Sequence, residues 1–177
     1  MRFVRNILLG LAGLIVLAAL GSFLLPRVVT VERTVTIDAP ATDIFPLVNS
    51  MQRTVEWSPW LEKDPNVVNT FTGPESGVGN KMAWASDSPD VGTGTQEIVE
   101  SVENQKVTTA LDFGAQGLAT AEFLLTDSGG GTDVTWTLIT DTGFNPMARI
   151  FGMMLDGFVG PDYEKGLANL KAVAEGA

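Results

Sequence analysis

The chain opens with a continuous apolar run at residues 7–25 that carries no charged side chain. A helix of that length extends about 28 Å, close to the hydrocarbon thickness of about 30 Å of a bilayer. Pro26 ends the run. The pattern therefore predicts a transmembrane helix at 7–25, a short N-terminal segment at 1–6 and a linker at 26–30 before the first folded element.

The same run also fits a cleavable signal peptide, whose cut would follow the small-x-small sequence Ala19-Leu20-Gly21. In that interpretation the mature chain begins at Ser22, and the domain is secreted or periplasmic. The apolar run continues past this site to Leu25, and the extra length favours an uncleaved anchor.

Charges on the two sides of the run predict its orientation. Arg2 and Arg5 precede it, whereas Arg27 alone follows closely. Because positive residues are retained on the cytoplasmic side, we expect the N-terminus in the cytoplasm and the rest of the chain outside it. The predicted location is the cell (inner) membrane, crossed once.

From residue 28 onward the pattern changes to the period-two alternation of half-buried strands. Valine and isoleucine alternate with polar residues up to Ile37, and turn clusters rich in glycine, proline, serine and asparagine then separate shorter runs. We predict two short helices, at 44–48 and 51–55, after the first strand. The predicted strands of an antiparallel meander are 28–37, 67–72, 81–85, 93–102, 107–113, 118–126 and 133–140.

The last part of the chain changes to helical spacing, and Pro161 is expected to kink or restart this helix. A seven-stranded sheet and a long amphipathic helix must each bury an apolar face, so we expect them to pack on each other. The pattern thus predicts one α+β domain with a long C-terminal helix. The residues of the apolar stripe are Met147, Ile150, Phe151, Met154, Leu155, Phe158, Tyr163, Leu167, Leu170 and Val173.

Composition narrows the chemistry of this domain. The chain has no histidine and no cysteine, which excludes Ser-His-Asp and Cys-His nucleophiles, disulfides and the usual zinc sites. All 21 acidic residues and nine of the 11 basic residues follow Pro26, so this part carries a formal charge of −12 and is not expected to bind nucleic acid. No catalytic residue, metal site or cofactor is predicted.

Four local sequences give a resemblance to a known family. They are VERTVTIDAP at 31–40, EWSPW at 56–60, GPESGVG at 73–79 and GPDYEKGLANLK at 160–171. Together with the order of elements, they are similar to the polyketide cyclase/dehydrase-type branch of the START-like, or SRPBCC, superfamily over nearly everything after Thr30. Many bacterial members of that branch similarly begin with one apolar segment.

The resemblance implies a helix-grip fold at 31–177, in which a curved antiparallel sheet of about seven strands wraps the C-terminal helix around a deep cavity for an apolar ligand. The superfamily includes lipid transporters, polyketide cyclases, hormone receptors and chaperone activators, and it shares no catalytic motif. We expect a membrane-anchored domain that binds or carries an apolar small molecule or lipid. The alternatives are a polyketide cyclase/dehydratase-like enzyme and a protein-interaction module, for which the sequence names no protein partner.

Three tryptophans are candidate ligand contacts. Trp57 and Trp60 flank Ser58-Pro59 and either form an aromatic lid over the cavity or fill the gap between the short helices and the sheet. Trp84 shares a strand face with Met82, where core packing is the alternative to ligand contact.

The remaining candidates lie on the first strand and on the C-terminal helix. Met154 and Phe158 have adaptable apolar side chains that suit a lipid-like ligand and equally suit a core. Arg33 shares a strand face with valines, so its guanidinium requires either a ligand carboxylate or phosphate or a nearby acid. Tyr163, the single tyrosine, either orients a ligand carbonyl or packs in the core with its hydroxyl at the rim.

Overall fold

The computed structural model describes residues 2–176. Met1 and Ala177, the outer ends of the predicted N-terminal segment and of the predicted domain, lie outside the described residues. In chain order the elements are α1 (Arg2–Ser22), β1 (Val28–Ile37), α2 (Ala41–Val48), α3 (Met51–Thr54), α4 (Trp60–Lys63), β2 (Val68–Thr72), β3 (Lys81–Ala85), β4 (Thr93–Val102), β5 (Lys106–Asp112), η1 (Gly114–Gln116), β6 (Leu118–Asp127), β7 (Thr132–Asp141), α5 (Pro146–Gly152) and α6 (Leu155–Ala174).

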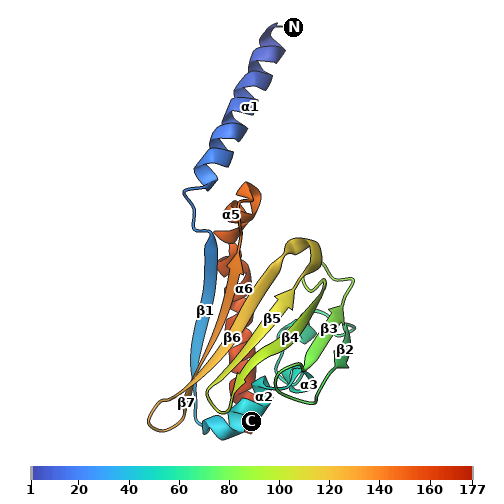
Figure 1. Cartoon of the computed structure of the whole chain (residues 1–177), viewed down its shortest axis with the longest axis vertical. Helices are drawn as coiled ribbons and strands as arrows, with labels where there is room; N and C mark the ends of the chain where they lie inside the picture. The colour runs from blue at the N-terminus through green and yellow to red at the C-terminus, as the bar shows by residue number, and fades with distance from the viewer. Residues whose placement is uncertain (1, 177) are drawn as a thin grey trace.

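The seven strands form one antiparallel sheet in the order β1-β7-β6-β5-β4-β3-β2. All seven predicted strands are confirmed, and no end is displaced by more than one residue, because the alternating runs are bounded by turn residues. The first strand lies at one edge and pairs along its whole length with β7. Helix α6 packs across β1 and β7 on one face of the curved sheet, as expected from their matching apolar faces (Figure 1).

The core lies between this face and the helices. Alternate residues of β7, namely Val134, Trp136 and Leu138, are buried. Leu167 and Leu170 of α6 meet them from the other side, and each is 2% exposed or less. Burial of an aliphatic side chain of this size contributes about 1.5–3 kcal/mol, so the period-two and helical patterns together specify which faces meet.

Helix α1 projects away from the domain (Figure 1), and the side chains described along it are exposed almost throughout. Its segment Phe3–Ser22 is long and apolar enough to cross a membrane, and an N-terminal signal sequence passes the same test. The helix begins and ends earlier than the predicted 7–25. It stops at Ser22, whose hydroxyl donates to the Ala19 carbonyl oxygen at 2.7 Å.

The predicted C-terminal helix is divided into two, at a different place from the one expected. The break lies between Gly152 and Leu155, whereas Pro161 lies inside α6 without interrupting it. Pro161 removes one backbone donor, and the buried side chains of Tyr163 and Leu167 in the next turns hold the helix together across that loss. The expectation that Pro161 restarts the helix is therefore wrong.

The short helix α5 also faces the opposite way from the prediction. Met147 and Phe151 of the predicted stripe are 72% and 56% exposed, whereas Arg149 and Gly152 are buried. Gly152 must be small, because a Cβ there would lie 2.8 Å from a methyl group of Val29. The apolar stripe of α5 thus points away from the sheet, and its one charged residue points inward.

Arg149 joins α1 to the domain. Its Nη1 donates to the carbonyl oxygens of Phe23 and Leu25, both at 3.1 Å, and its Nε and Nη2 donate to the carbonyl oxygen of Gly143 at 3.0 and 2.9 Å. The guanidinium carbon also lies 5.2 Å from the centre of the Phe23 ring. We call the segment 23–27, with Asp141, Gly143 and Arg149, the neck.

A second arginine completes the neck. Arg27 makes a bidentate ion pair with Asp141, with both nitrogen to oxygen distances at 2.7 Å. The carbonyl oxygen of Arg27 accepts from the backbone nitrogen of Thr142 at 2.9 Å and from its hydroxyl at 2.7 Å. The end of α1 is therefore fixed to the end of β7 on two sides.

The Arg27–Asp141 pair predicts an acid-sensitive neck. Hydrogen bonds from Arg27 and then from the Gly143 backbone lower the pKa of Asp141 to about 2. Because this pKa is depressed in the folded chain, the pair stabilises the neck above the usual aspartate pKa of about 3.9, and we expect that contribution to fall as the pH falls toward 2. Amide hydrogen exchange of Thr142 between pH 5 and 2 measures it. Asp141→Asn should remove this pH dependence, and an unchanged profile in that variant would contradict the assignment.

Candidate functional site

A cluster of aromatic side chains fills the space between α6 and the sheet. Trp136 of β7 stacks between Phe123 of β6 and Tyr163 of α6, with ring centroids 4.8 and 3.7 Å away. Trp57 and Trp60 pack edge-on against Trp136 at 5.5 and 5.8 Å. The deep cavity that the resemblance implies is thus occupied at this place by the protein's own side chains.

The two tryptophans that flank Ser58-Pro59 differ in exposure. Trp57 is 3% exposed, and its indole nitrogen donates to the Leu47 carbonyl oxygen at 3.0 Å. Trp60, the first residue of α4, is half-buried at the edge of the same cluster. Trp57 therefore fills the gap between the short helices and the sheet, which was one of the two alternatives. Trp60 reaches the rim of the aromatic cluster, where a lid would lie.

Tyr163 is the innermost of the predicted site residues on α6. It is 2% exposed, and its burial raises the pKa of its phenol. A phenol with a raised pKa remains protonated at neutral pH, so Tyr163 can donate a hydrogen bond but cannot act as a base there.

Further along the same face, on β2 to β6, apolar side chains are only half-buried. The register places Leu111 opposite Ala119, and Ala119 opposite Thr140. Thr140 in turn pairs with Val29, at the start of β1, so this surface lies at the end of the sheet nearer to α1. We call it the inner apolar surface, and its residues are Phe71, Met82, Trp84, Leu111, Phe113 and Ala119.

The inner apolar surface has few polar groups. Along β4 to β7, the described residues that share this face include one ionisable side chain, that of Asp127, which lies at the end of β6 away from α1. Gln96 and Thr109 lie among them, and the amide nitrogen of Gln96 donates to the Thr109 hydroxyl at 2.9 Å. Trp84 lies closely over Gly94, and its indole nitrogen donates to the carbonyl oxygen of Val91 at 3.3 Å. The arrangement suits burial of an apolar molecule beside one amide, and it offers no acid or base.

Arg33 is held by two acids of α6. Its Nη1 lies 2.9 Å from Asp156, and its Nε lies 2.7 Å from Glu164. These hydrogen bonds, that of Asp156 before that of Glu164, raise the pKa of Arg33, and the bond from Arg33 lowers the pKa of Asp156. A side chain at Gly160 would collide with the guanidinium. Of the two partners expected for Arg33, a ligand anion or a nearby acid of the chain, the structure therefore has the acid.

Met154 and Phe158 lie apart from the other candidates. Each is 54% exposed, and the residues of this part of α6 that pack on the core are Leu155 and Val159. The prediction placed them with the sheet-facing stripe because it assumed that the helix runs unbroken from Met147 to Phe158. The break before Leu155 changes the helical phase, so Met154 and Phe158 do not line the interior.

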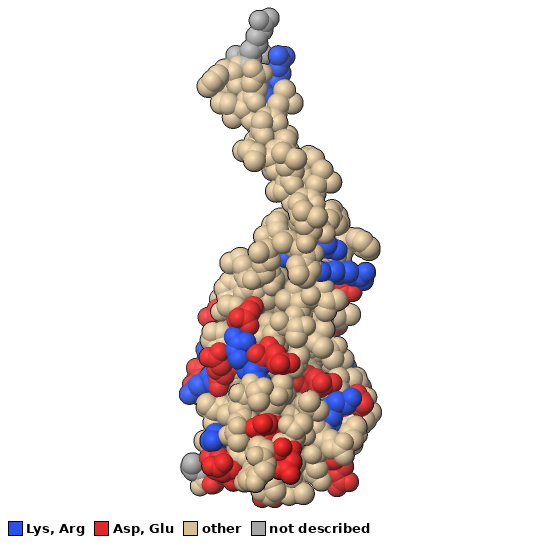
Figure 2. All heavy atoms as spheres, turned by 90° about the vertical axis from the view of Figure 1, so that its left-hand side faces the viewer, with Lys and Arg blue, Asp and Glu red and all other residues tan. Residues whose placement is uncertain are grey.

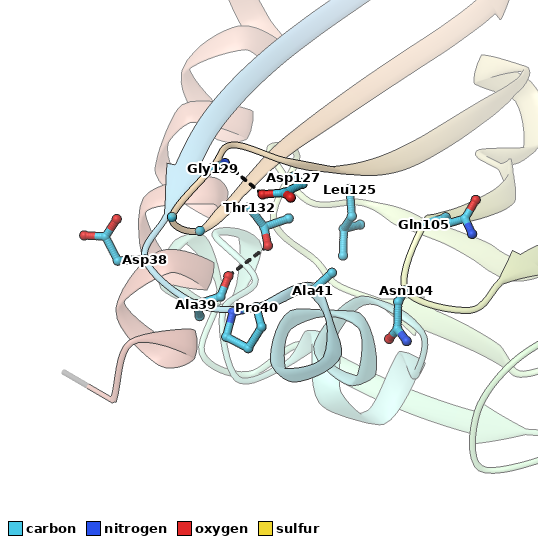
Figure 3. A pocket seen from close by; sticks show the side chains of 12 residues that line it. Asp38, Ala39, Pro40, Ala41, Asn104, Gln105, Leu125, Asp127, Gly129 and Thr132 are labelled. Atoms are coloured by element: carbon cyan, nitrogen blue, oxygen red, sulfur yellow. Dashed lines mark hydrogen bonds between the residues drawn. The ribbon is translucent and has the colours of Figure 1, made fainter.

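Two surface hollows lie elsewhere. One, of about 660 Å³, lies at the far end of the domain from α1, beside the β6–β7 hairpin (Figures 1 and 3). There the Thr132 hydroxyl donates to the Ala39 carbonyl oxygen at 2.8 Å, and Asp127 accepts from the Gly129 backbone at the same distance. The other, of about 440 Å³, lies between α4 and the end of β3. None of the seven predicted site residues lines either hollow.

One family model matches nearly all of the folded part of this chain. It is described as polyketide cyclase / dehydrase and lipid transport, and it matches residues 28–175, from the start of β1 to just past the end of α6. The chain belongs to this family. The resemblance found in the sequence is confirmed for the domain, and α1 lies outside the matched residues.

Solved structures show the fold that this polyketide cyclase/dehydrase and lipid transport family member adopts. A protein from Thermobifida fusca has 18% identity and a TM-score of 0.63, with 82% of this chain and 92% of that chain covered. The di-domain ARO/CYC StfQ of the steffimycin biosynthetic pathway has 16% identity and a TM-score of 0.62, covering 85% and 51%. The Aha1 dimer from Colwellia psychrerythraea has 15% identity and a TM-score of 0.54, covering 83% and 96%. No curated protein sequence matches the chain.

Sequence reasoning missed two groups in this family member. Leu111, Phe113 and Ala119 were read only as strand residues, since alternation alone does not say which part of a face a helix covers. Arg149 was passed over, although a single charge within the apolar segment 147–151 is a usable signal. A lone arginine on an apolar helix needs acceptors, and here they are backbone carbonyl groups.

Proposed function

We propose that this protein binds or carries an apolar small molecule or lipid on its inner apolar surface. The single observation that carries the proposal is a row of half-buried apolar side chains on β2 to β6, at the end of the sheet nearer to α1, where the described residues of this face carry no ionisable group. Apolar surface of this kind gains about 25 cal/mol per Å² when a ligand removes it from water. Gln96 and the rim residue Trp60 supply the polar and aromatic contacts that would orient the ligand.

The aromatic cluster limits the depth of such a site. Trp136, Tyr163 and Trp57 fill the centre of the fold, so the ligand lies against β3 to β6 instead of behind α6. Among the predicted contacts, Trp60 and Trp84 remain in this proposal. Arg33, Trp57 and Tyr163 support the fold around it, and Met154 and Phe158 lie outside it.

The alternative is a polyketide cyclase/dehydratase-like enzyme. The family description and the ARO/CYC neighbours support it at the level of the family. Against it stands the chemistry of the inner face, where Tyr163 is buried and protonated, and where the one carboxylate on β4 to β7, that of Asp127, lies at the end of β6 away from the inner apolar surface. Turnover of an added aromatic polyketide that Tyr163→Phe abolishes would favour the enzyme.

We also propose that α1 anchors the domain in the cell membrane, with the N-terminus in the cytoplasm and the domain outside it. The length, exposure and apolar character of Phe3–Ser22 support this, as does the positive charge that precedes the run. The alternative, cleavage after Gly21, would release a domain that keeps Phe23 and Leu25, and with them the acceptors of Arg149.

A pair of neighbouring substitutions tests the binding surface. Ala119→Trp fills the inner apolar surface, whereas Leu118→Trp alters the opposite, exposed side of the same strand. Native mass spectrometry of the full chain purified from its membrane should find a retained apolar molecule. We expect Ala119→Trp to lower its occupancy about tenfold, equivalent to about 1.4 kcal/mol, and Leu118→Trp to leave it unchanged. Equal retention by both variants, or an empty wild-type protein, would sink the proposal.

A further inference from the structure

The region around the neck exposes an unusual set of apolar side chains. Between Gly143 and Leu155 the only ionisable residue is Arg149, and it is buried. Contiguous exposed apolar surface of this kind marks a binding surface. We call it the collar, and its residues, each more than half exposed, are Leu24, Phe144, Met147, Phe151, Met153 and Met154.

Helix α5 exposes its apolar face and buries its one charged residue, as a helix does when its outer face contacts an apolar phase. It turns Met147 and Phe151 outward and buries Arg149 and Gly152. In water this arrangement is unfavourable, because it exposes methionine and phenylalanine and removes a guanidinium from solvent. Phe158 of α6 extends the exposed face, with its ring centroid 5.9 Å from that of Phe151.

The collar is tied to the end of α1 by the neck. Arg149 lies between them and donates to the carbonyl groups of Phe23 and Leu25. Leu24, 91% exposed, follows the last helical residue, Ser22, by two positions. If α1 crosses a bilayer, the collar is therefore held at the depth where the helix leaves it.

The distribution of charged side chains on the domain is consistent with contact between the collar and a bilayer. On the face that Figure 2 shows, most of the acidic side chains lie on the part of the domain away from α1, and basic side chains with a smaller acidic area lie beside the lower end of α1. Anionic lipid headgroups would repel the acidic end and not the collar. The charged groups near the collar are Arg27 and Arg149 of the neck, together with two acids that are already paired, Asp141 with Arg27 and Asp156 with Arg33.

We propose that the collar inserts into the outer interfacial layer of the bilayer that α1 crosses, so that the domain lies on the membrane with its inner apolar surface near the lipid. This inference rests on the proposed anchoring role of α1. Apolar faces of interfacial helices lie about 5–10 Å into the headgroup and acyl boundary, which is within reach of one short helix beside the anchor. A ligand then passes between bilayer and protein without crossing bulk water.

Site-directed spin labelling tests the insertion, and the absence of native cysteine makes single labels specific. Full-length Phe151→Cys and Met147→Cys report on the collar, and Ser128→Cys in the β6–β7 turn is the matched exposed control. In lipid vesicles we expect collar labels to collide with oxygen and to be shielded from a water-soluble nickel chelate. The control label should collide more with the nickel chelate than with oxygen. We expect the ratio of oxygen to nickel accessibility to differ several-fold between the collar labels and the control.

Each other outcome overturns the inference in a distinguishable way. If the chain floats with the vesicles and the collar labels are as accessible to nickel as Ser128→Cys, the anchor stands and the collar proposal fails. If the chain does not float, both fail. Spin–spin broadening that grows with the protein-to-lipid ratio would instead show that a second copy covers the collar. Retention of ligand by the wild-type chain is measured separately, so failure of the binding proposal remains distinct.

Discussion

Replacing Trp136 by alanine is expected to destabilise the folded domain by about 3–5 kcal/mol, the range for loss of a large aromatic side chain from a core. Trp136 is 3% exposed and contacts the rings of Phe123, Tyr163, Trp57 and Trp60 from three elements and a loop. Its removal leaves a cavity that these flat rings cannot close without moving α6. Urea unfolding of the full chain, followed by far-ultraviolet circular dichroism, measures the change.

Trp136→Phe is the matched control. It retains an aromatic ring between Phe123 and Tyr163, and it removes an indole nitrogen that is buried without a hydrogen-bond partner among the described residues. Losing an unpaired polar group offsets part of the lost packing, so we expect a cost well below that of alanine. Equal destabilisation by the two substitutions would mean that ring stacking contributes little here.

Arg149→Met is expected to open the neck at a cost of about 1–3 kcal/mol, because the part-buried carbonyl groups of Phe23, Leu25 and Gly143 lose their donor. Methionine keeps much of the apolar volume, so the loss reports mainly on hydrogen bonds. The measurement is hydrogen exchange of the Thr142 amide, which donates to Arg27 of the neck, together with the unfolding midpoint. Faster exchange confined to the neck is the expected pattern.

Arg53→Met provides the comparison for the neck variant. Arg53 is a half-exposed arginine that pairs with Glu56 one helical turn away. Exposed pairs of this kind contribute about 0–1 kcal/mol, so this variant should remain close to wild type. If Arg149→Met and Arg53→Met behave alike, Arg149 does not hold α1 to the domain.

The strands were predictable because each depends on local information. Alternation over 28–37 and the turn glycines at 129–131 specify a strand and a hairpin without reference to the rest of the chain. Arg33 was recognised as needing a partner for the same reason, since an arginine on a valine face is a local contradiction. Its actual partners, Asp156 and Glu164, lie 123 and 131 residues away.

The arrangement of the candidate site could not be predicted from the alternation of apolar and polar residues. Which tryptophan fills the fold and which reaches its rim is decided by the position of α6 over β1 and β7. The stripe that includes Met147 and Phe151 has helical spacing, but spacing cannot say whether its partner is a sheet or a different apolar phase. The deep cavity was inferred from the family, whereas the large rings of Trp136 and Tyr163 occupy that space in this chain.

The edge position of β1 fixes the order in which the sheet can be completed during synthesis. Its one neighbour in the sheet is β7, which ends at Asp141. At ribosomal rates of about 5–20 residues per second, roughly 5–20 s separate the emergence of β1 from that of its partner. The β2–β6 meander can form in that interval from local hairpins, and β1 waits unpaired beside α1 until β7 arrives. The sheet therefore closes only after β7 has emerged, and the neck only after Arg149 of α5 has followed it.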